Sequence, residues 1–247
     1  MTGKSSTVLI VGAASDIGRA LAREYAKAGA SLILAAHRVE RLAPDAEDLK
    51  LRHGTTVRLA ECDLLDLAGH ERFLDTLGEP PDIALCVVGL LGQQQAAEAD
   101  AAAADLIMRS NYNAPALLLN AVAARMERRG SGHIVGISSV AGDRGRASNY
   151  VYGSAKAGFT AFLSGLRNRL AGKGVAVLTV KPGFVDTRMT EGMALPPLLT
   201  AKPIEVAQAV RRAQERGRDV LYVRPIWRVI MLVIRLLPEG LFKRMRI

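Results

Sequence analysis

A tyrosine and a lysine stand four residues apart in the segment YVYGSAKAG (150–158), whose other residues are mostly small and helix-compatible. Residues four apart on a helix share a face, so we expect Tyr152 and Lys156 to meet, whereas Tyr150 points elsewhere. An ammonium group near a phenol favours the phenolate and lowers the tyrosine pKa. Such a tyrosine can pass a proton to a carbonyl oxygen near neutral pH. Because this spacing also arises by chance on amphipathic helices, the pair alone does not assign the chemistry.

The elements that would position this pair alternate along the chain. Short, nearly continuous apolar runs predict strands buried on both faces at 7–12, 31–36, 56–62, 82–89, 133–139, 175–183 and 219–223. Amphipathic segments between them predict helices at 17–28, 39–51, 67–77, 96–109, 114–129, 152–171 and 203–216. Repeated strand–helix–strand units form right-handed crossovers, which predicts a seven-stranded, doubly wound parallel sheet with helices on both faces. We therefore expect one α/β domain over residues 1–224 and a C-terminal extension over 225–247.

The positive charge of the chain is concentrated near its C-terminus. The net charge is +9, and residues 211–247 hold ten basic and three acidic residues, which leaves the other residues nearly neutral. Aromatic residues make up only 4% of the chain and do not alternate with the basic ones as a base-stacking surface requires. The composition therefore argues against a nucleic-acid partner.

Cysteine content and the N-terminal sequence indicate a reducing compartment. Cys62 and Cys86 each follow or end an apolar run and have no partner at metal or redox spacing, so we expect buried free thiols and no metal site. The segment MTGKSSTVLIVG has no signal-peptide core or cleavage site. The expected location is cytoplasmic.

A glycine turn follows the first predicted strand. Gly12 and Gly18 are the first and last residues of GAASDIG, where a tight turn leads into a helix whose N-terminus can attract a pyrophosphate. Asp16 lies in this turn, and a carboxylate repels phosphates unless it points away. We expect Asp16 to cap the following helix, with Ser15 as the alternative cap.

The end of the second strand indicates which dinucleotide binds. In LAAHRVERL no acidic residue precedes Glu40 to bind a ribose 2′-hydroxyl, whereas His37 and Arg38 can accommodate a 2′-phosphate. This favours NADP(H) over NAD(H), although His37 could equally begin a solvated helix. Asp63, just after the third strand, is either an adenine contact or a helix cap.

A serine and an asparagine elsewhere in the chain join Tyr152 and Lys156 as candidate catalytic residues. Ser139 closes the fifth strand thirteen residues before Tyr152, and Asn111 lies in SNYN. Together with Tyr152 and Lys156 they resemble the catalytic group of the short-chain dehydrogenase/reductase family. KPGFVDT (181–187) resembles the family's segment beside the nicotinamide. The resemblance spans most of the chain and implies a Rossmann-type fold.

The resemblance also implies a role for each residue. Tyr152 would give a proton to a ketone oxygen while hydride arrives from the nicotinamide, and Ser139 would orient that carbonyl. Lys156 would bind the nicotinamide ribose and lower the Tyr152 pKa, and Asn111 would hold a water through its backbone. The implied cofactor-binding residues are Gly12, Ser15, Asp16, Ile17, Gly18, His37, Arg38, Asp63, Leu64, Gly89, Tyr152, Lys156, Pro182, Gly183, Val185 and Thr187.

Two departures from the family pattern narrow the resemblance. Asp16 replaces a glycine of the turn, and VVGLLG (87–92) stands where most relatives have Asn-Asn-Ala-Gly. With 138–158 and the tail 225–247, these segments resemble the group that reduces decaprenylphosphoryl 2-keto-ribose to the arabinose lipid. That resemblance implies an NADPH-dependent reductase of a polyprenyl-phosphate-linked 2-keto-pentose in cell-wall synthesis. It would perform the second step of an epimerisation beside a flavin-dependent oxidase, as a homo-oligomer like most relatives.

Two other functions stay open at this stage. The first is an NADP-dependent reductase of another hydrophobic ketone, such as a ketoacyl chain or a sterol-like alcohol. The second is a non-catalytic nucleotide-sensing or membrane-interaction protein on the same fold, since fold does not fix function. An intact Ser139, Tyr152 and Lys156 argue against the second.

The C-terminal segment has an apolar core with basic borders. VIMLVI lies between Arg228 and Arg235, and the apolar run is too short to cross a bilayer. Trp227 and Phe242 among basic residues are typical of a helix lying in the plane of an anionic membrane surface. The alternative is that the segment covers the substrate cleft or packs on a partner subunit. A membrane-bound tail would place the protein peripherally on the inner face of the cell membrane.

Overall fold

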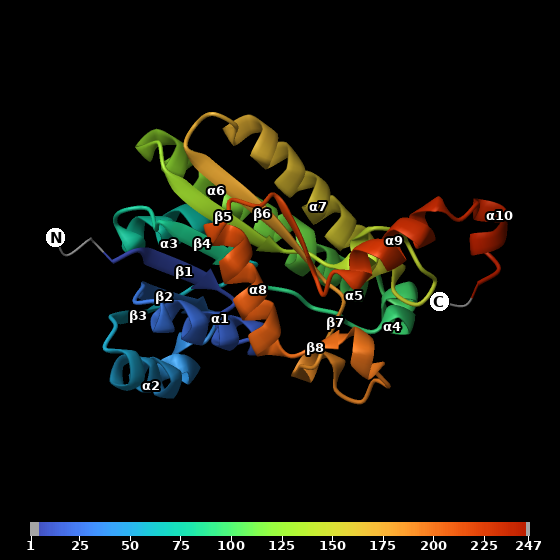
Figure 1. Ribbon diagram of the computed structural model, residues 1–247, viewed down its shortest axis with the longest axis horizontal. Coiled ribbons are helices and arrows are strands. Elements are labelled where there is room, and N and C mark those ends of the chain that lie inside the picture. The colour runs from blue at the N-terminus through green and yellow to red at the C-terminus, as the bar shows by residue number, and fades with distance from the viewer. Residues whose placement is uncertain (1–4, 246–247) are drawn as a thin grey trace.

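Seven parallel strands form the main sheet of this computed structural model, which describes residues 5–245 (Figure 1). Their order across the sheet is β3-β2-β1-β4-β5-β6-β9. The strands are β1 (Thr7–Val11), β2 (Ser31–Ala36), β3 (Val57–Glu61), β4 (Ile83–Cys86), β5 (Gly132–Ile137), β6 (Val175–Pro182) and β9 (Val220–Val223). The predicted seven-stranded, doubly wound parallel sheet is confirmed.

Helices cover both faces of this sheet. One layer holds α1 (Asp16–Lys27), α2 (Ala43–His53) and α8 (Pro203–Glu215), and the other holds α3 (His70–Leu77), α6 (Ala114–Arg129) and α7 (Tyr150–Leu170). In β1, Val8 and Ile10 belong to the first core, whereas Leu9 and Val11 belong to the second. Because successive strand residues point to opposite faces and both are covered, the strands are nearly all apolar.

The predicted helix at 96–109 is wrong in one respect, because two shorter helices take its place. These are α4 (Gln94–Ala99) and α5 (Ala101–Met108). Asp100 between them has an extended backbone, and its side chain accepts a hydrogen bond from the Ala102 N–H. Aspartate favours this capping geometry over a helix interior, and the alanine-rich composition concealed the break.

Several helices begin or join through irregular turns. The helices predicted at 39–51 and 67–77 start as 3₁₀ turns, Val39–Leu42 and Leu67–Gly69, before α2 and α3. A π-type turn, Arg109–Asn113, joins α5 to α6. Such turns shift the helical hydrogen-bond ladder and often occur at functional positions.

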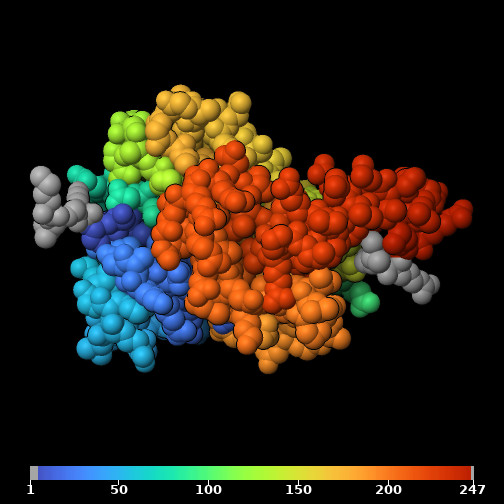
Figure 2. Space-filling view, viewed as in Figure 1, coloured from blue at the N-terminus to red at the C-terminus, as the bar shows by residue number. Residues whose placement is uncertain are grey.

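Several elements after β6 lie outside the main sheet and its two helical layers. A small parallel sheet pairs β7 (Phe184–Val185) with β8 (Thr200–Ala201), and two C-terminal helices follow, α9 (Ile226–Leu236) and α10 (Glu239–Phe242). In Figure 1 these elements gather with α4 at one end of the main sheet, and in Figure 2 the red C-terminal segment lies directly against the orange segment that precedes it. Further short 3₁₀ turns lie at Val140–Gly142, between β5 and α7, and at Arg188–Thr190 and Pro197–Leu199, between β7 and β8.

Helix α9 has a buried face and an exposed apolar face. Trp227 and Met231 are buried against Val140, and Phe184 packs against the same cluster. The opposite face exposes Ile226, Val229, Leu232, Val233 and Leu236. Within residues 5–245 no helix is long and apolar enough to cross a membrane.

Candidate active site

Two adjoining cavities lie at the carboxyl end of the sheet. The larger, of about 650 Å³, is lined by residues that end or follow β1 to β4, and the smaller, of about 160 Å³, is lined by residues that follow β5 and β6. Gly89 and Thr187 are among the residues that line both. The carboxyl ends of parallel strands are where ligands bind in open α/β sheets.

The glycine turn is tightly packed beside the larger cavity. Gly12 has a φ of +86°, and a Cβ there would lie 2.9 Å from Val88 Cγ2. A Cβ on Gly18 would lie 2.5 Å from the Gly12 carbonyl oxygen, so Gly18 serves the turn and does not line the cavity. The Ser15 Oγ accepts a hydrogen bond from the Gly18 N–H at 3.0 Å. Ser15 is therefore the helix cap, as the alternative prediction had it.

Asp16 does not cap α1, and this preferred prediction is wrong. Its carboxylate accepts hydrogen bonds from the Arg188 backbone N–H at 2.9 Å and from the Arg188 Nε at 3.1 Å. The Arg188 Nη2 also donates to the Ala14 carbonyl oxygen. The residue that departs from the family's glycine pattern thus ties the turn to the 3₁₀ turn Arg188–Thr190, across the larger cavity that both residues line.

The region predicted to select the dinucleotide contains an acidic residue that the sequence did not point to. Glu61 at the end of β3 accepts hydrogen bonds from the Arg38 and Val39 N–H groups, which lower the Glu61 pKa. The His37 Nδ1 lies 3.7 Å from Glu61 Oε1 and 4.0 Å from Asp63 Oδ2. His37 and Asp63 line the larger cavity, but Arg38, with a φ of +57°, does not.

The predicted catalytic side chains come together in the smaller cavity, which Ser139, Tyr152 and Lys156 all line. The Ser139 Oγ accepts a hydrogen bond from the Ala141 N–H and caps the 3₁₀ turn that follows β5. Its neighbour Ser138, which the sequence did not single out, donates from Oγ to the Lys156 carbonyl oxygen at 3.0 Å. Ser138 thereby fastens the end of β5 to α7.

Burial sets the proton affinities of the tyrosine and the lysine. The Lys156 side chain is 2% exposed, its Nζ donates to the Ile137 carbonyl oxygen, and desolvation lowers its pKa to about 8. Desolvation raises the Tyr152 pKa to about 12, opposed by a side-chain hydrogen bond with Ser139. The Lys156 Nζ lies 5.8 Å from the Tyr152 ring centroid. The Tyr152 pKa is therefore raised where the sequence predicted a lowering, because burial of the phenol dominates it.

Asn111 holds the segment that replaces Asn-Asn-Ala-Gly. Its side chain is fully buried in the π-type turn, and its Nδ2 donates to the Leu90 and Ile107 carbonyl oxygens at 2.7 and 2.8 Å. Its Oδ1 accepts from the Leu90 N–H at 3.2 Å. Asn111 thus fixes residues 87–92, whose Gly89 lies between the two cavities.

The remaining predicted residues divide between the two cavities. Ile17 lines both, and Leu64 lines the larger one. Pro182, Gly183 and Val185 line the smaller one. The side chains that line the smaller cavity and that the sequence did not assign to the site include Arg146, Asn149, Met189, Met193 and Trp227. None of them belongs to a motif, although Arg146 and Asn149 lie in the segment 138–158 and Trp227 begins the tail.

Comparisons with known proteins agree with this geometry. The protein-family model described as "short chain dehydrogenase" matches residues 6–195. An uncharacterized oxidoreductase of Mycobacterium tuberculosis is 43% identical over 244 residues, covering 98% of this chain and 97% of that protein.

Solved structures of dehydrogenases are also similar to this chain over most of its length. A short-chain dehydrogenase from Sphingobium yanoikuyae in complex with NADPH has a TM-score of 0.81 and 27% identity, over 98% of this chain and 96% of that one. The bulky-bulky ketone specific alcohol dehydrogenase from Comamonas testosteroni has a TM-score of 0.77 and 29% identity, over 98% and 95%.

Proposed function

The chain belongs to the short-chain dehydrogenase/reductase family and is an NAD(P)-dependent oxidoreductase, and from this premise we propose that it is an NADPH-dependent ketoreductase. One observation carries the proposal: Ser139, Tyr152 and Lys156 line one cavity that adjoins another of about 650 Å³ beside a glycine turn. The similar structure from Sphingobium yanoikuyae is a complex with NADPH, which supports the choice of cofactor.

The larger cavity fits a dinucleotide. Gly12 lines this cavity and leaves room for Val88 on its other side, and the N-terminal residues of α1 line the same cavity. Gly12, Ser15 and Ile17 would hold the pyrophosphate region, and His37 with Asp63 would hold the adenosine end. Bound NADPH supplies a hydride for a substrate carbonyl.

The protein's own groups handle the proton and the orientation of the carbonyl. Tyr152, with a pKa raised to about 12, stays protonated at neutral pH and can donate its phenolic proton to a ketone oxygen. The Ser139 hydroxyl orients the same oxygen by a hydrogen bond. Lys156 holds a positive charge below its pKa of about 8 and so stabilises negative charge that develops on Tyr152 as the proton leaves. Asn111 keeps the wall at 87–92 in place and, through its backbone, would hold a water that returns a proton.

The proposed substrate is a polyprenyl-phosphate-linked 2-keto-pentose. The segments 87–92, 138–158 and 225–247 support it by their resemblance, and the protein would then act after a flavin-dependent oxidase that makes the ketone. We also expect the homo-oligomeric state usual in the family. The second candidate is another bulky hydrophobic ketone, which the apolar side chains Phe184, Met193 and Trp227 in the smaller cavity favour.

The outer face of α9 supports a place on a membrane. Leu232 and Val233 are 56% and 55% exposed, Leu236 is 73% exposed, and the exposed Arg228 and Arg235 lie on the same helix. An apolar stripe beside cations suits the surface of an anionic bilayer, where each basic residue contributes ~1 kcal/mol. In this arrangement α9 covers the cleft with one face and docks on the inner membrane surface with the other, so the protein works from the cytoplasm.

The test compares Tyr152→Phe with Tyr150→Phe. Tyr150 begins the same helix and is exposed, so its loss leaves turnover unchanged. Tyr152→Phe is expected to fold and bind NADPH yet lose about 10²–10⁴-fold in kcat for keto-sugar lipids, followed by cofactor absorbance. Substantial remaining turnover would remove Tyr152 from the acid role. NADPH binding by the wild type without turnover of any ketone would instead favour a nucleotide-sensing protein.

A further inference from the structure

Two buried polar atoms, on residues that line the smaller cavity, have no hydrogen-bond partner in the described part of the chain. Among the residues that the structure describes, the Arg146 Nε and the Asn149 Oδ1 are buried and have no hydrogen-bond partner. Both residues line the cavity that holds Tyr152. Buried polar atoms are normally paired, because an unpaired one costs about 1–3 kcal/mol. Two such atoms in one small cavity indicate that a ligand completes them.

Arg146 also forms no salt bridge among the residues that the structure describes, although the charge of Asp143 acts on it from a distance. Within residues 5–245, the Arg146 Nη2 donates to a weak acceptor, the Met231 Sδ at 3.3 Å. The nearby carboxylate of Asp143 is already bound by the Lys181 Nζ and by the Tyr222 hydroxyl at 2.8 Å. Burial lowers the Arg146 pKa, and the negative charge of Asp143 opposes this lowering only in part. An arginine remains charged nonetheless, so the cavity wall presents a desolvated positive charge.

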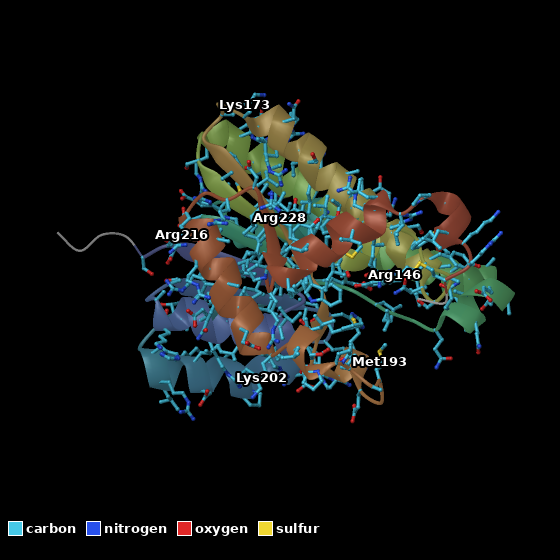
Figure 3. The ribbon with its side chains drawn as sticks, turned by 45° about the vertical axis from the view of Figure 1, so that its right-hand side comes forward. Arg146, Lys173, Met193, Lys202, Arg216 and Arg228 are labelled. Carbon is cyan, nitrogen blue, oxygen red and sulfur yellow. The ribbon has the colours of Figure 1, made fainter. Side chains whose placement is uncertain are left out.

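The guanidinium of the neighbouring Arg144 is satisfied by the protein, in contrast to that of Arg146. The Arg144 guanidinium pairs with Glu239, donates to the Leu237 carbonyl oxygen at 2.7 Å and stacks on the Phe242 ring at 3.7 Å. Arg144 therefore fastens the C-terminal helices and has its charge satisfied. Arg146, two residues later, points its Nε at no protein acceptor. Figure 3 shows Arg146 on the side of the molecule where the C-terminal helices lie, with Met193 on the same side.

We infer that Arg146 and Asn149 form a subsite for the phosphate group and an adjacent hydroxyl of a phosphorylated ketone. This inference rests on the proposed ketoreductase function and adds the residues that would bind the phosphate group of the substrate. A guanidinium offers two parallel N–H donors to a phosphate, and the Asn149 Oδ1 accepts from a hydroxyl. The cavity, at about 160 Å³, has the volume of about five waters. It therefore takes the phosphorylated head of a substrate, and any long chain must leave it.

The chain's one tryptophan allows a binding test without turnover. Trp227 lines the same cavity, so its fluorescence reports occupation by a ligand. The full-length protein, saturated with NADP⁺, is titrated with farnesyl phosphate and with farnesol, which differ only by the phosphate. We expect wild type to bind farnesyl phosphate at least about tenfold more tightly, since one charged hydrogen-bonded pair gives such a difference. In Arg146→Met this preference is expected to vanish.

Two further variants separate binding from packing. Arg146→Lys keeps the charge without the fork of donors and is expected to retain part of the preference. It also serves as the test if Arg146→Met fails to fold. Arg144→Met disturbs the tail, so it changes the fluorescence of the free protein but keeps the preference for phosphate. Equal affinity of the wild type for both ligands, or an unchanged preference in Arg146→Met, would overturn the subsite.

A third ligand identifies the source of the phosphate. Dihydroxyacetone phosphate that binds as tightly as farnesyl phosphate would assign the subsite to water-soluble phosphorylated ketones. Binding of farnesyl phosphate alone would assign it to a lipid-linked phosphate, and both results support the subsite. Because no turnover is measured, failure of this test leaves the Tyr152 experiment unaffected, and the reverse is also true.

Discussion

Helix α9 is pressed against the backbone at Gly183, and this contact predicts a large effect of one methyl group. A Cβ at Gly183 would lie 2.0 Å from the Trp227 Nε1 and Cε2 atoms, whereas ordinary contacts begin at 3.4 Å. The indole must therefore move by about 1.4 Å in Gly183→Ala, the difference between these two distances. The Trp227 Nε1 donates to the Leu199 carbonyl oxygen at 3.0 Å, and the ring packs edge-on against Phe184. A shift of this size away from Leu199 breaks the hydrogen bond and disturbs the packing of the two rings, whose centroids lie 5.3 Å apart.

The expected loss in the free energy of unfolding follows from these contacts. Overpacking costs about 1–3 kcal/mol and a lost hydrogen bond about 1 kcal/mol, so Gly183→Ala should lose about 2–4 kcal/mol. For a chain of this size each kcal/mol lowers Tm by about 2–4 °C. Because Trp227 is the only tryptophan and is 4% exposed, its emission should shift to longer wavelength as the ring enters water. The KM for ketone should rise as well, since Gly183 and Trp227 line the cavity of Tyr152.

Gly165→Ala is the matched control. Gly165 lies within α7, and a Cβ there would meet no atom within 4 Å. Alanine is favoured over glycine inside helices by about 1 kcal/mol, so this variant should be slightly more stable with unchanged emission. Wild-type Tm, emission and KM in Gly183→Ala would refute the argument that the tail is held tightly against this glycine.

Three further predictions follow from charges and exposed faces. Asp16→Asn should bind NADPH about fivefold more tightly, because a negative charge near the phosphates is removed while Arg188 keeps an acceptor; weaker binding in a fluorescence titration would mean that the ion pair itself builds the site. Burial lowers the Lys156 pKa from 10.5 to about 8, so between these pH values the unfolded chain binds more protons and stability rises with pH. The unfolding free energy of wild type minus that of Lys156→Met, measured in urea, should therefore increase by about 3 kcal/mol across this window, and a constant difference would contradict the burial effect. Leu232→Glu with Val233→Glu should reduce sedimentation with phosphatidylglycerol vesicles at least about tenfold, whereas Leu51→Glu, exposed on α2, should not; equal sedimentation of both would end the membrane proposal.

The central part of the sheet could be predicted from the sequence because its strands are buried on both faces. Val8, Leu9 and Ile10 of β1 are all fully buried and form a continuous apolar run, whereas the edge strands β3 and β9 keep exposed residues. Helix interruptions were less visible. Asp100 breaks a run of alanines by a local capping bond, and the π-type turn at 109–113 is fixed by contacts of Asn111 with distant residues. Neither appears in the periodicity of apolar residues.

The site was predictable where residues follow a motif and not where distant segments meet. Tyr152 and Lys156 share a helix, so their spacing placed them together, but the Tyr152 pKa depends on burial that no spacing reveals. The partner of Asp16 is Arg188, far along the chain, and Glu61 reaches the end of β2 only through strand pairing. Such contacts are set by tertiary structure, which single-sequence patterns do not contain.

One loop links the tail to the catalytic residues. Between Ser139 and Tyr152, Asp143 binds Lys181 at the end of β6 and Tyr222 on β9, Arg144 binds the C-terminal helices, and Arg146 faces the cavity. Two neighbouring charges, Asp143 and Arg144, therefore fasten this loop to β6, β9 and the C-terminal helices, and α9 reaches the cavity through Trp227. The loop and α9 are fastened to each other. A change that loosens the tail should therefore first widen the substrate cavity and raise KM, while the two hydrophobic cores on the faces of the main sheet stay folded.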